Sequence, residues 1–199
     1  MKNVFLLLAI LFFAGCVQQG FVHDGISVSR VGDSFSITVN GTNIYLEPSG
    51  IPAGAPVADY IFLSYDDCDR ESMLRITDEN TTIVGTYECV RSMQGRIYSM
   101  GQAEYLSFGN GIVKVSSVPV ERGEGDKGNG YYISAGNRTL YFIPDTNSVP
   151  LIKQGIDVAF LPEPGSAALL KPKVVVPTMG SSDVFSKALD GSGIQVKAI

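Results

Sequence analysis

The sequence predicts one strand-rich α/β (α+β) domain, and three observations lead to this prediction. Short segments that alternate between polar and apolar residues are joined by turn pairs such as Asn40-Gly41 and Asn110-Gly111, which is the pattern of β-hairpins. Residues 158–161 and 174–176 are continuous apolar runs, as expected of strands covered on both faces. Short segments with helical signals lie between the strands, so helices are interspersed with the sheet.

The same signals place the individual elements along the chain. Strands are expected at residues 34–39, 43–46, 61–63, 82–86, 106–108, 112–118, 131–134, 139–143, 158–161 and 174–176. Helices are expected at 69–76, 165–170 and 183–189, with Ser182 as the N-cap of the last. The sequence contains no recognisable internal repeat, so a single core is expected.

Residues 1–15 have the features of an export signal. Lys2 precedes an apolar run that ends at Phe13, which is too short to span a bilayer as a stable helix. The run ends in Phe13-Ala14-Gly15-Cys16, which resembles a lipobox, the motif whose cysteine thiol receives a lipid. We therefore expect a signal peptide at 1–15, a lipidated tether at 16–24 and the folded domain at 25–199. The alternative is an uncleaved N-terminal anchor, and both predict an exported domain on the outer face of a membrane.

Composition and cysteine content agree with export. The chain has 15 Lys and Arg against 20 Asp and Glu, so no basic surface favours nucleic acid. Once Cys16 is lipidated, Cys68 and Cys89 remain as an even pair on the oxidising side of a membrane. A βαβ crossover brings the ends of the two preceding strands to the same sheet edge, so a disulfide is expected. The alternative is two buried free thiols.

Residues 61–70 carry an informative resemblance. The segment Ile61-Phe62-Leu63-Ser64-Tyr65-Asp66-Asp67-Cys68-Asp69-Arg70 leads from an apolar strand through a polar loop into a helix start. It resembles the His-x-His-x-Asp-His signature of the metallo-β-lactamase superfamily, the loop that holds its two metals. In that register the three histidine positions are Tyr65, Asp67 and Arg70, and only Asp69 matches.

Other segments resemble the same superfamily in the same order. Residues 25–54 resemble its opening hairpin, with Gly32-Asp33-Ser34 where the lactonase-like branch has Gly-His and Glu47-Pro48 where Asp-Pro usually stands. Three later segments, 118–122, 141–146 and 157–180, place Arg122, Asp145 and Met179 at ligand positions. The resemblance covers most of residues 25–199 and implies a four-layer αββα sandwich whose site lies along the loops at one edge.

The resemblance also implies that the metal site has been replaced. The positions that converge on one pocket in the superfamily carry Asp33, Tyr65, Asp67, Asp69, Arg70, Arg122, Asp145 and Met179. The only histidine of the chain is His23, in the expected tether, where a solvated side chain is expected. A site that needs several imidazoles is therefore expected to bind no zinc and to carry no catalytic residue. We hypothesise that Arg70 and Arg122 replace the metals electrostatically and hold the carboxylates in a salt-bridge network.

Three functional classes follow from this sequence. The first is a non-catalytic, membrane-tethered binding module whose partner is a small anionic ligand or another protein. The second is a hydrolase that binds a divalent cation, Mg²⁺ or Ca²⁺, through Asp67, Asp69 and Asp145. The third is a purely structural surface protein. The expected cofactor is none in the first and third classes and a divalent cation in the second.

Two further motifs do not change this interpretation. Residues 123–128 fit the letters G-x-G-x-x-G, but they lead into a strand and not into the helix that would hold a phosphate. A hairpin loop is therefore expected there. The sequons at Asn40, Asn80 and Asn137 lie in turns and are either glycosylation acceptors or ordinary turn asparagines.

Overall fold

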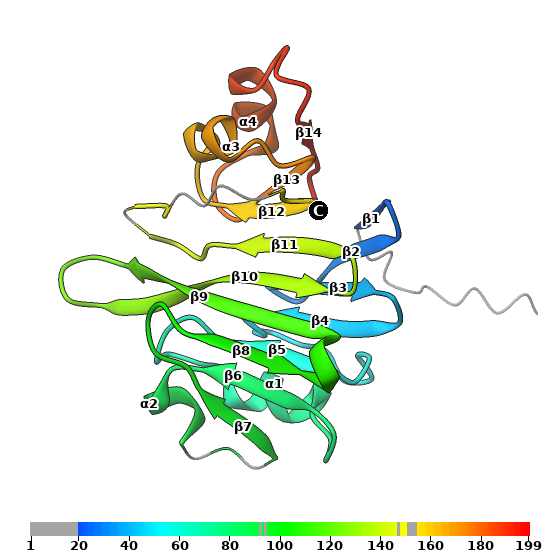
Figure 1. Ribbon diagram of the computed structural model, residues 1–199, viewed down its shortest axis with the longest axis vertical. Coiled ribbons are helices and arrows are strands. Elements are labelled where there is room, and N and C mark those ends of the chain that lie inside the picture. Colours follow the sequence, from blue (N-terminus) through cyan, green and yellow to red (C-terminus); the bar gives the residue numbers. More distant parts are fainter. Residues whose placement is uncertain (1–19, 92, 94, 147, 151–154) are drawn as a thin grey trace, which may run out of the picture.

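The computed structural model describes residues 20–91, 93, 95–146, 148–150 and 155–199. Within these residues the chain forms two seven-stranded sheets that stack face to face, with helices on both outer faces (Figure 1). The predicted four-layer αββα arrangement is therefore confirmed. The expected signal peptide and Cys16 lie outside the described residues.

The first sheet contains the first half of the chain, in sequential order from β1 to β7. Its strands are β1 (Gly20–His23), β2 (Ile26–Val31), β3 (Ser34–Val39), β4 (Thr42–Leu46), β5 (Tyr60–Phe62), β6 (Thr82–Gly85) and β7 (Arg96–Ser99). The pairs from β1 to β4 are antiparallel hairpins, and the pairs from β4 to β7 are parallel. The parallel half therefore places the carboxyl ends of its strands at one edge.

The second sheet repeats this plan with the second half of the chain. Its strands are β8 (Tyr105–Phe108), β9 (Val113–Glu121), β10 (Lys127–Ala135), β11 (Arg138–Phe142), β12 (Val158–Leu161), β13 (Val174–Pro177) and β14 (Gln195–Val196). The pairs from β8 to β11 are antiparallel, and those from β11 to β14 are parallel. The duplication is structural, because no repeat is visible in the sequence.

Four short helices and one 3₁₀ turn connect the strands. They are α1 (Arg70–Ile76), α2 (Tyr87–Val90), α3 (Pro164–Leu170), α4 (Ser182–Ala188) and the 3₁₀ turn η1 (Gly109–Gly111). Asp69 caps α1 and Ser181 caps α4, each by accepting a hydrogen bond from a backbone N–H of the first turn. Figure 1 shows α3 and α4 beside strands β12–β14 of the second sheet and α1 and α2 beside strands β5–β7 of the first.

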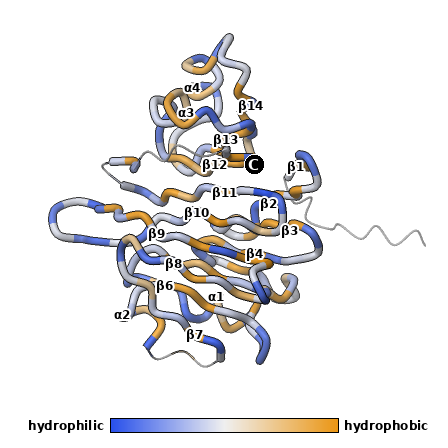
Figure 2. Tube along the Cα trace, in the orientation of Figure 1, coloured by the Kyte–Doolittle hydropathy of each residue, from blue (hydrophilic) through white to orange (hydrophobic). Residues whose placement is uncertain are grey.

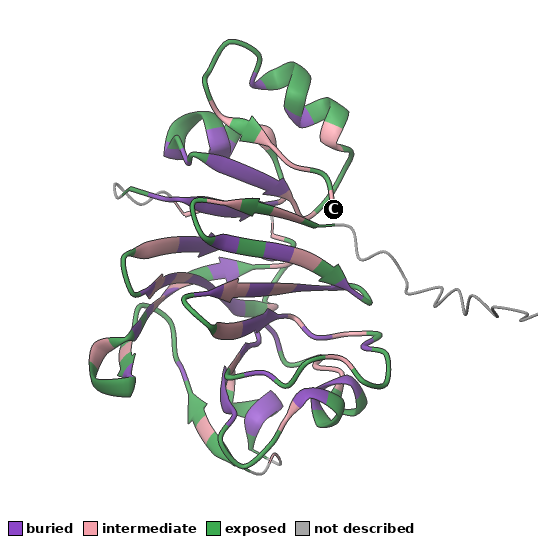
Figure 3. Cartoon of the chain, turned by 90° about the vertical axis from the view of Figure 1, so that its right-hand side faces the viewer, coloured by how far each residue is buried: buried purple, intermediate pink, exposed green. Residues whose placement is uncertain are grey.

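The apolar side chains form three layers that match this architecture. The central layer, between the sheets, contains Ile37, Phe62, Tyr131 and Phe160 among others. A second layer packs Phe185 and Leu170 of the helices against the second sheet, and a third packs Met73 and Ile76 of α1 against the first. Figures 2 and 3 show the apolar, buried residues on the strands and the polar, exposed ones on hairpin loops and outer helix faces.

The structure corrects the start of the domain. Residues 20–23, expected in a tether, form strand β1, which pairs with β2. Within this strand His23 is partly buried, and its Nε2 atom lies 3.7 Å from Oδ2 of Asp24 with no hydrogen-bond partner among the described residues. The expectation of a solvated tether histidine is therefore wrong. No helix in the described ranges is long and apolar enough to cross a membrane.

Candidate functional site

The loops that follow the parallel strands meet at one edge of the sandwich. The backbone N–H of Asn129 in β10 donates to the carbonyl of Ser64 after β5 at 2.9 Å, which joins the two sheets. The hydroxyl of Tyr65 donates to the carbonyl oxygen of Asp145, after β11, at 2.7 Å. The edge built by these loops and the β9–β10 hairpin is called the site edge below, and it lies on the left in Figure 1.

Arg122 is the central side chain of the site edge. Its Nη2 atom lies 2.9 Å from Oδ2 of Asp67, and its Nε atom lies 2.8 Å from Oδ2 of Asp126. Its guanidinium carbon stands 4.4 Å from the centroid of the Tyr65 ring. These four residues form the Arg122 cluster. The hydrogen bond to Asp126 is the largest of the effects that raise the pKa of Arg122 further above its ordinary value, so the cation is permanent.

Tyr65 fills the space beneath Arg122. Its side chain is buried, and Gly128 of β10 packs directly on the ring, where a Cβ atom would lie 2.5 Å from two ring carbons. Burial raises the pKa of Tyr65 to about 12, although the nearby Arg122 guanidinium opposes the shift. The phenol is therefore neutral near pH 7 and acts as a packed, hydrogen-bonded filler.

Asp69 and Arg70 do not join this cluster. Asp69 caps α1: it accepts hydrogen bonds from the N–H of Ser72 at 3.0 Å and from the Ser72 hydroxyl at 2.7 Å. The backbone hydrogen bond from Ser72 is the main reason why the pKa of Asp69 is lowered. Arg70 lines a separate recess of about 620 Å³ beside Leu74 and Met93, and it forms none of the ion pairs in the described ranges. The hypothesis that Arg70 neutralises the carboxylates is therefore wrong.

The remaining predicted positions lie on the site edge without entering the cluster. The backbone N–H of Asp33 donates to the carbonyl of Ser49 at 2.9 Å, and its side chain is exposed. Asp145 is exposed and contributes its backbone carbonyl to the Tyr65 hydroxyl. Met179 is 45% exposed after β13. Among the described contacts, no hydrogen bond or ion pair links these three side chains to Arg122.

Two contributors were missed by the sequence reasoning. Asp126 is the second anchor of Arg122, and the signal was available because residues 122 and 126 flank the tip of the expected hairpin. Glu47 is partly buried behind the loop, where its Oε1 accepts the N–H of Ser64 at 2.6 Å. Burial raises the pKa of Glu47 to about 7, against the opposing hydrogen bonds from Ser64.

A disulfide holds the loop of the Arg122 cluster to the neighbouring helix. Cys68 and Cys89 are joined, as expected from the sequence, with their Cα atoms 5.9 Å apart. The bond ties the loop that carries Asp67 to α2. Asp66, in the same loop, accepts a hydrogen bond from the Thr86 hydroxyl just before α2. The loop is therefore fixed from both sides by protein groups.

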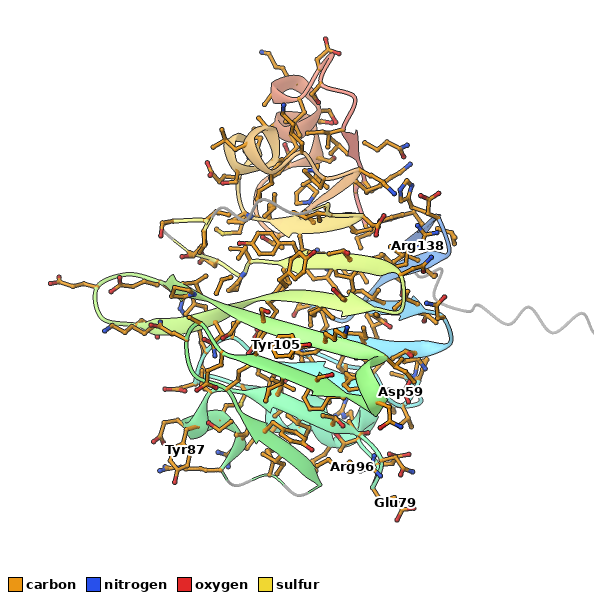
Figure 4. All side chains as sticks on the ribbon, in the orientation of Figure 1. Asp59, Glu79, Tyr87, Arg96, Tyr105 and Arg138 are labelled. Atoms are coloured by element: carbon orange, nitrogen blue, oxygen red, sulfur yellow. A yellow bond between two sulfur atoms is a disulfide. The ribbon has the colours of Figure 1, made fainter. Side chains whose placement is uncertain are left out.

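The site edge is strongly acidic. Most of the 20 Asp and Glu of the chain lie on its loops and helix starts, namely Asp33, Glu47, Asp66, Asp67, Asp69, Glu88, Glu104, Glu121, Glu124, Asp126, Asp145, Glu163 and Asp183. Fewer basic side chains accompany them, namely Arg70, Arg91, Arg122 and Lys127, and Arg91 is paired with Glu88 at 3.0 Å. Figure 4 shows Tyr87 near this edge and Arg138 on the far side of the molecule.

The opposite edge carries a more balanced cluster. Nζ of Lys173 lies 2.7 Å from Oδ1 of Asp157 and 3.5 Å from Oδ2 of Asp24. Nη1 of Arg138 lies 3.7 Å from Oδ1 of Asp157 and 3.6 Å from Oδ2 of Asp24. These four residues form the Asp157 cluster. Asp24 belongs to the first sheet and the others to the second, so this cluster also links the two sheets.

Solved structures with the same fold include metal-dependent hydrolases. A protein of Parabacteroides distasonis named as a metal-dependent hydrolase superposes with a TM-score of 0.77 at 20% identity, covering 91% of this chain and 98% of that one. Igni18, a metallo hydrolase from Ignicoccus hospitalis, superposes with a TM-score of 0.64 at 14% identity, covering 87% and 94%. YhfI from Bacillus subtilis, a metallo-β-lactamase fold protein, superposes with a TM-score of 0.57 at 12% identity, covering 85% of this chain and 89% of that one.

These likenesses show the metallo-β-lactamase fold, as the sequence resemblance predicted. No family model matches the chain, and no curated protein matches it by sequence. The residues present do not fit the metals that such a fold implies, because the described part of the chain has no group of three or more His, Cys, Asp or Glu that could hold one. Asp67 is engaged by Arg122, and Asp69 by the start of α1. The proposed carboxylate site at Asp67, Asp69 and Asp145 is not assembled in this arrangement.

Proposed function

We propose that this chain, which has the metallo-β-lactamase fold, is a non-catalytic binding module, exported and held on the outer face of a membrane by a lipid on Cys16. The Arg122 cluster is the observation that supports the non-catalytic role. A metal in this fold would activate water by lowering its pKa to near 7. Here the central cation is a guanidinium, which has no coordination site for water.

No other group in the cluster replaces that function. Tyr65 is a neutral phenol whose hydroxyl is already donated to a backbone carbonyl. Asp67 and Asp126 each accept a hydrogen bond from Arg122 through Oδ2, so one oxygen of each carboxylate is already engaged by the guanidinium. The cluster therefore supports a closed, structural edge better than a reacting one.

The charge of the site edge also indicates which class of partner would bind there. Acidic side chains dominate this edge, so its long-range field attracts cationic surfaces and repels anionic small molecules. A protein partner with Lys and Arg on its surface therefore fits better than the small anionic ligand that was one of the two expectations.

The test of the non-catalytic role is a hydrolysis assay with an internal control. Wild-type protein and Asp145→Asn are incubated with lactone, thioester and phosphodiester substrates, with and without added zinc. We expect no zinc-stimulated turnover from either. A zinc-stimulated activity that wild type shows and Asp145→Asn lacks would contradict the proposal, and so would an activity that both proteins keep through further purification steps.

The test of the anchor is Cys16→Ser. We expect the wild-type protein to have the mass of a lipidated chain that begins at Cys16 and to partition with membranes. We expect Cys16→Ser to be released into the soluble fraction or to accumulate as an unprocessed precursor. An unchanged mass and unchanged membrane partitioning in Cys16→Ser would contradict lipidation.

A further inference from the structure

The folded domain begins very close to its proposed anchor. Cys16 lies four positions before Gly20, the first residue of strand β1. Four residues span at most roughly 14 Å even when fully extended. If Cys16 is lipidated, as the proposed function requires, the bilayer surface must lie against the part of the domain around β1.

The surface around β1 has the chemistry of a headgroup contact. Val22 points outward and is 73% exposed on this edge strand, whereas Phe21 beside it packs against the core. Lys173 and Arg138 stand next to the β1–β2 turn, and both lie within 4 Å of Asp24. The Lys173 side chain is 55% exposed, so its ammonium, which is shared with Asp157 and Asp24, lies at the surface that would face phosphate groups.

The charge distribution selects one orientation among those that the tether allows. The acidic side chains are concentrated on the site edge, whereas the Asp157 cluster beside β1 pairs its carboxylates with Arg138 and Lys173. An anionic headgroup layer therefore repels the site edge more strongly than the opposite edge, where the carboxylates are paired with cations. Figure 1 shows β1 on the far side of the molecule from the β9–β10 hairpin.

We infer that the β1 side of the domain, with Val22, Arg138 and Lys173, lies against the anionic headgroups of the bilayer. The site edge then points away from the membrane and presents the Arg122 cluster and the hairpin tip at Glu124 to other molecules. This orientation deepens the proposed function, because it makes the site edge the surface on which a partner docks.

The chain allows a direct test by site-specific labelling. With Cys16 lipidated and Cys68 joined to Cys89, a cysteine introduced at Val22→Cys or Glu124→Cys is the only free thiol. Each full-length lipidated variant is labelled with a fluorophore and reconstituted into phosphatidylglycerol vesicles that carry a spin-label quencher at headgroup depth. We expect the label at 22 to be quenched several-fold more than the label at 124.

The outcomes separate this inference from the proposed function. Equal quenching at the two positions, or stronger quenching at 124, overturns the orientation while leaving the anchor intact. Failure of the unlabelled wild-type protein to float with vesicles overturns the anchor and with it this inference. A second variant, Lys173→Gln, should reduce the difference in quenching between the labels at positions 22 and 124 on phosphatidylglycerol vesicles. On neutral phosphatidylcholine vesicles it should leave that difference unchanged. If Lys173→Gln leaves the difference unchanged on both kinds of vesicle, the role of charge is overturned.

Discussion

The two ends of the sandwich are closed by ion-pair clusters that differ in burial and charge. In the Arg122 cluster the side chains of Arg122, Asp67 and Asp126 are 38%, 63% and 43% exposed. In the Asp157 cluster the side chains of Asp157 and Arg138 are only 10% and 25% exposed, whereas those of Lys173 and Asp24 are 55% and 48% exposed. Both clusters connect the first sheet to the second, so they perform the same structural task in different surroundings.

Because of this difference in burial, the two clusters are expected to contribute differently to the stability of the fold. A buried carboxylate that loses its partners leaves an uncompensated charge, whereas a half-exposed pair is replaced by water at little cost. The Asp157 cluster should therefore contribute more to folding than the Arg122 cluster. In the proposed function the Arg122 cluster instead shapes the surface of the site edge, because it puts a permanent cation over a buried ring there.

The largest expected effect comes from the covalent link of the site edge. Replacing Cys68 and Cys89 together by Ser should lower the free energy of unfolding by about 3 kcal/mol, because the bond closes a loop of 21 residues in the unfolded chain. The measurement is urea denaturation, with Cys16→Ser as the matched control that should leave domain stability unchanged. Equal stability with and without the pair would show that the non-covalent contacts alone fix the loop.

The next effect tests the opposite edge. Asp157→Ala should cost about 2 kcal/mol near neutral pH, because the carboxylate also accepts the N–H of Thr139 at 2.8 Å. Burial alone would raise the pKa of Asp157, but the hydrogen bonds from Lys173 and Thr139 and the nearby Arg138 outweigh it and lower the pKa. The stabilisation is therefore present above the ordinary Asp pKa and should disappear as the pH falls through the lowered value. A pH-independent loss would point to packing instead.

A smaller effect concerns Glu47 behind the site edge. Its pKa is raised from 4.5 to about 7 in the folded protein, so the folded state holds the proton more tightly than the unfolded state. The resulting stabilisation is complete below about pH 4.5 and is lost as the pH rises toward 7. Glu47→Gln should remove this dependence, so its free energy of unfolding should rise relative to that of wild type as the pH increases from about 5 to about 8. If the free energies of unfolding of the two proteins, measured by urea denaturation, change with pH in parallel, the raised pKa of Glu47 is contradicted.

The smallest effect on stability should come from Arg122. Arg122→Ala removes two half-exposed ion pairs and one cation–π contact, for a loss of about 1 kcal/mol. Arg122→Lys is the control that keeps the charge but loses the two-pronged geometry. Added Ca²⁺ should raise the melting temperature of Arg122→Ala more than that of wild type, because Asp67 and Asp126 are then without their cation. A loss as large as that of Asp157→Ala would reverse the comparison of the two clusters.

The interior of the fold could be predicted from the sequence because its signals are local. Residues 34–39 alternate and residues 158–161 are uniformly apolar, and both segments form strands with these bounds. Strands β7 and β14 were missed because they are short edge strands with largely exposed side chains. Strand β1 was missed for the same reason and was expected to be part of the tether.

The site was predicted less completely because a motif gives backbone positions but not side-chain directions. The alignment with the superfamily motifs placed Arg122 and Asp67 on facing loops, and in the structure the two side chains form an ion pair. Arg70 follows the cap residue Asp69 and turns outward with the first turn of α1, which no spacing rule reveals. Asp126 depends on the conformation of the hairpin tip, where the N–H of Arg122 donates to the carbonyl of Asp126.

The most direct test of the central claim, that a guanidinium has replaced the metals at the site edge, is the metal content of the wild-type protein. Protein purified without chelator and dialysed against excess zinc should carry well under one zinc per chain by elemental mass spectrometry, because phenol, thioether and guanidinium are poor or impossible zinc ligands. One or two equivalents of zinc in wild type, lost in Asp145→Asn, would contradict the claim.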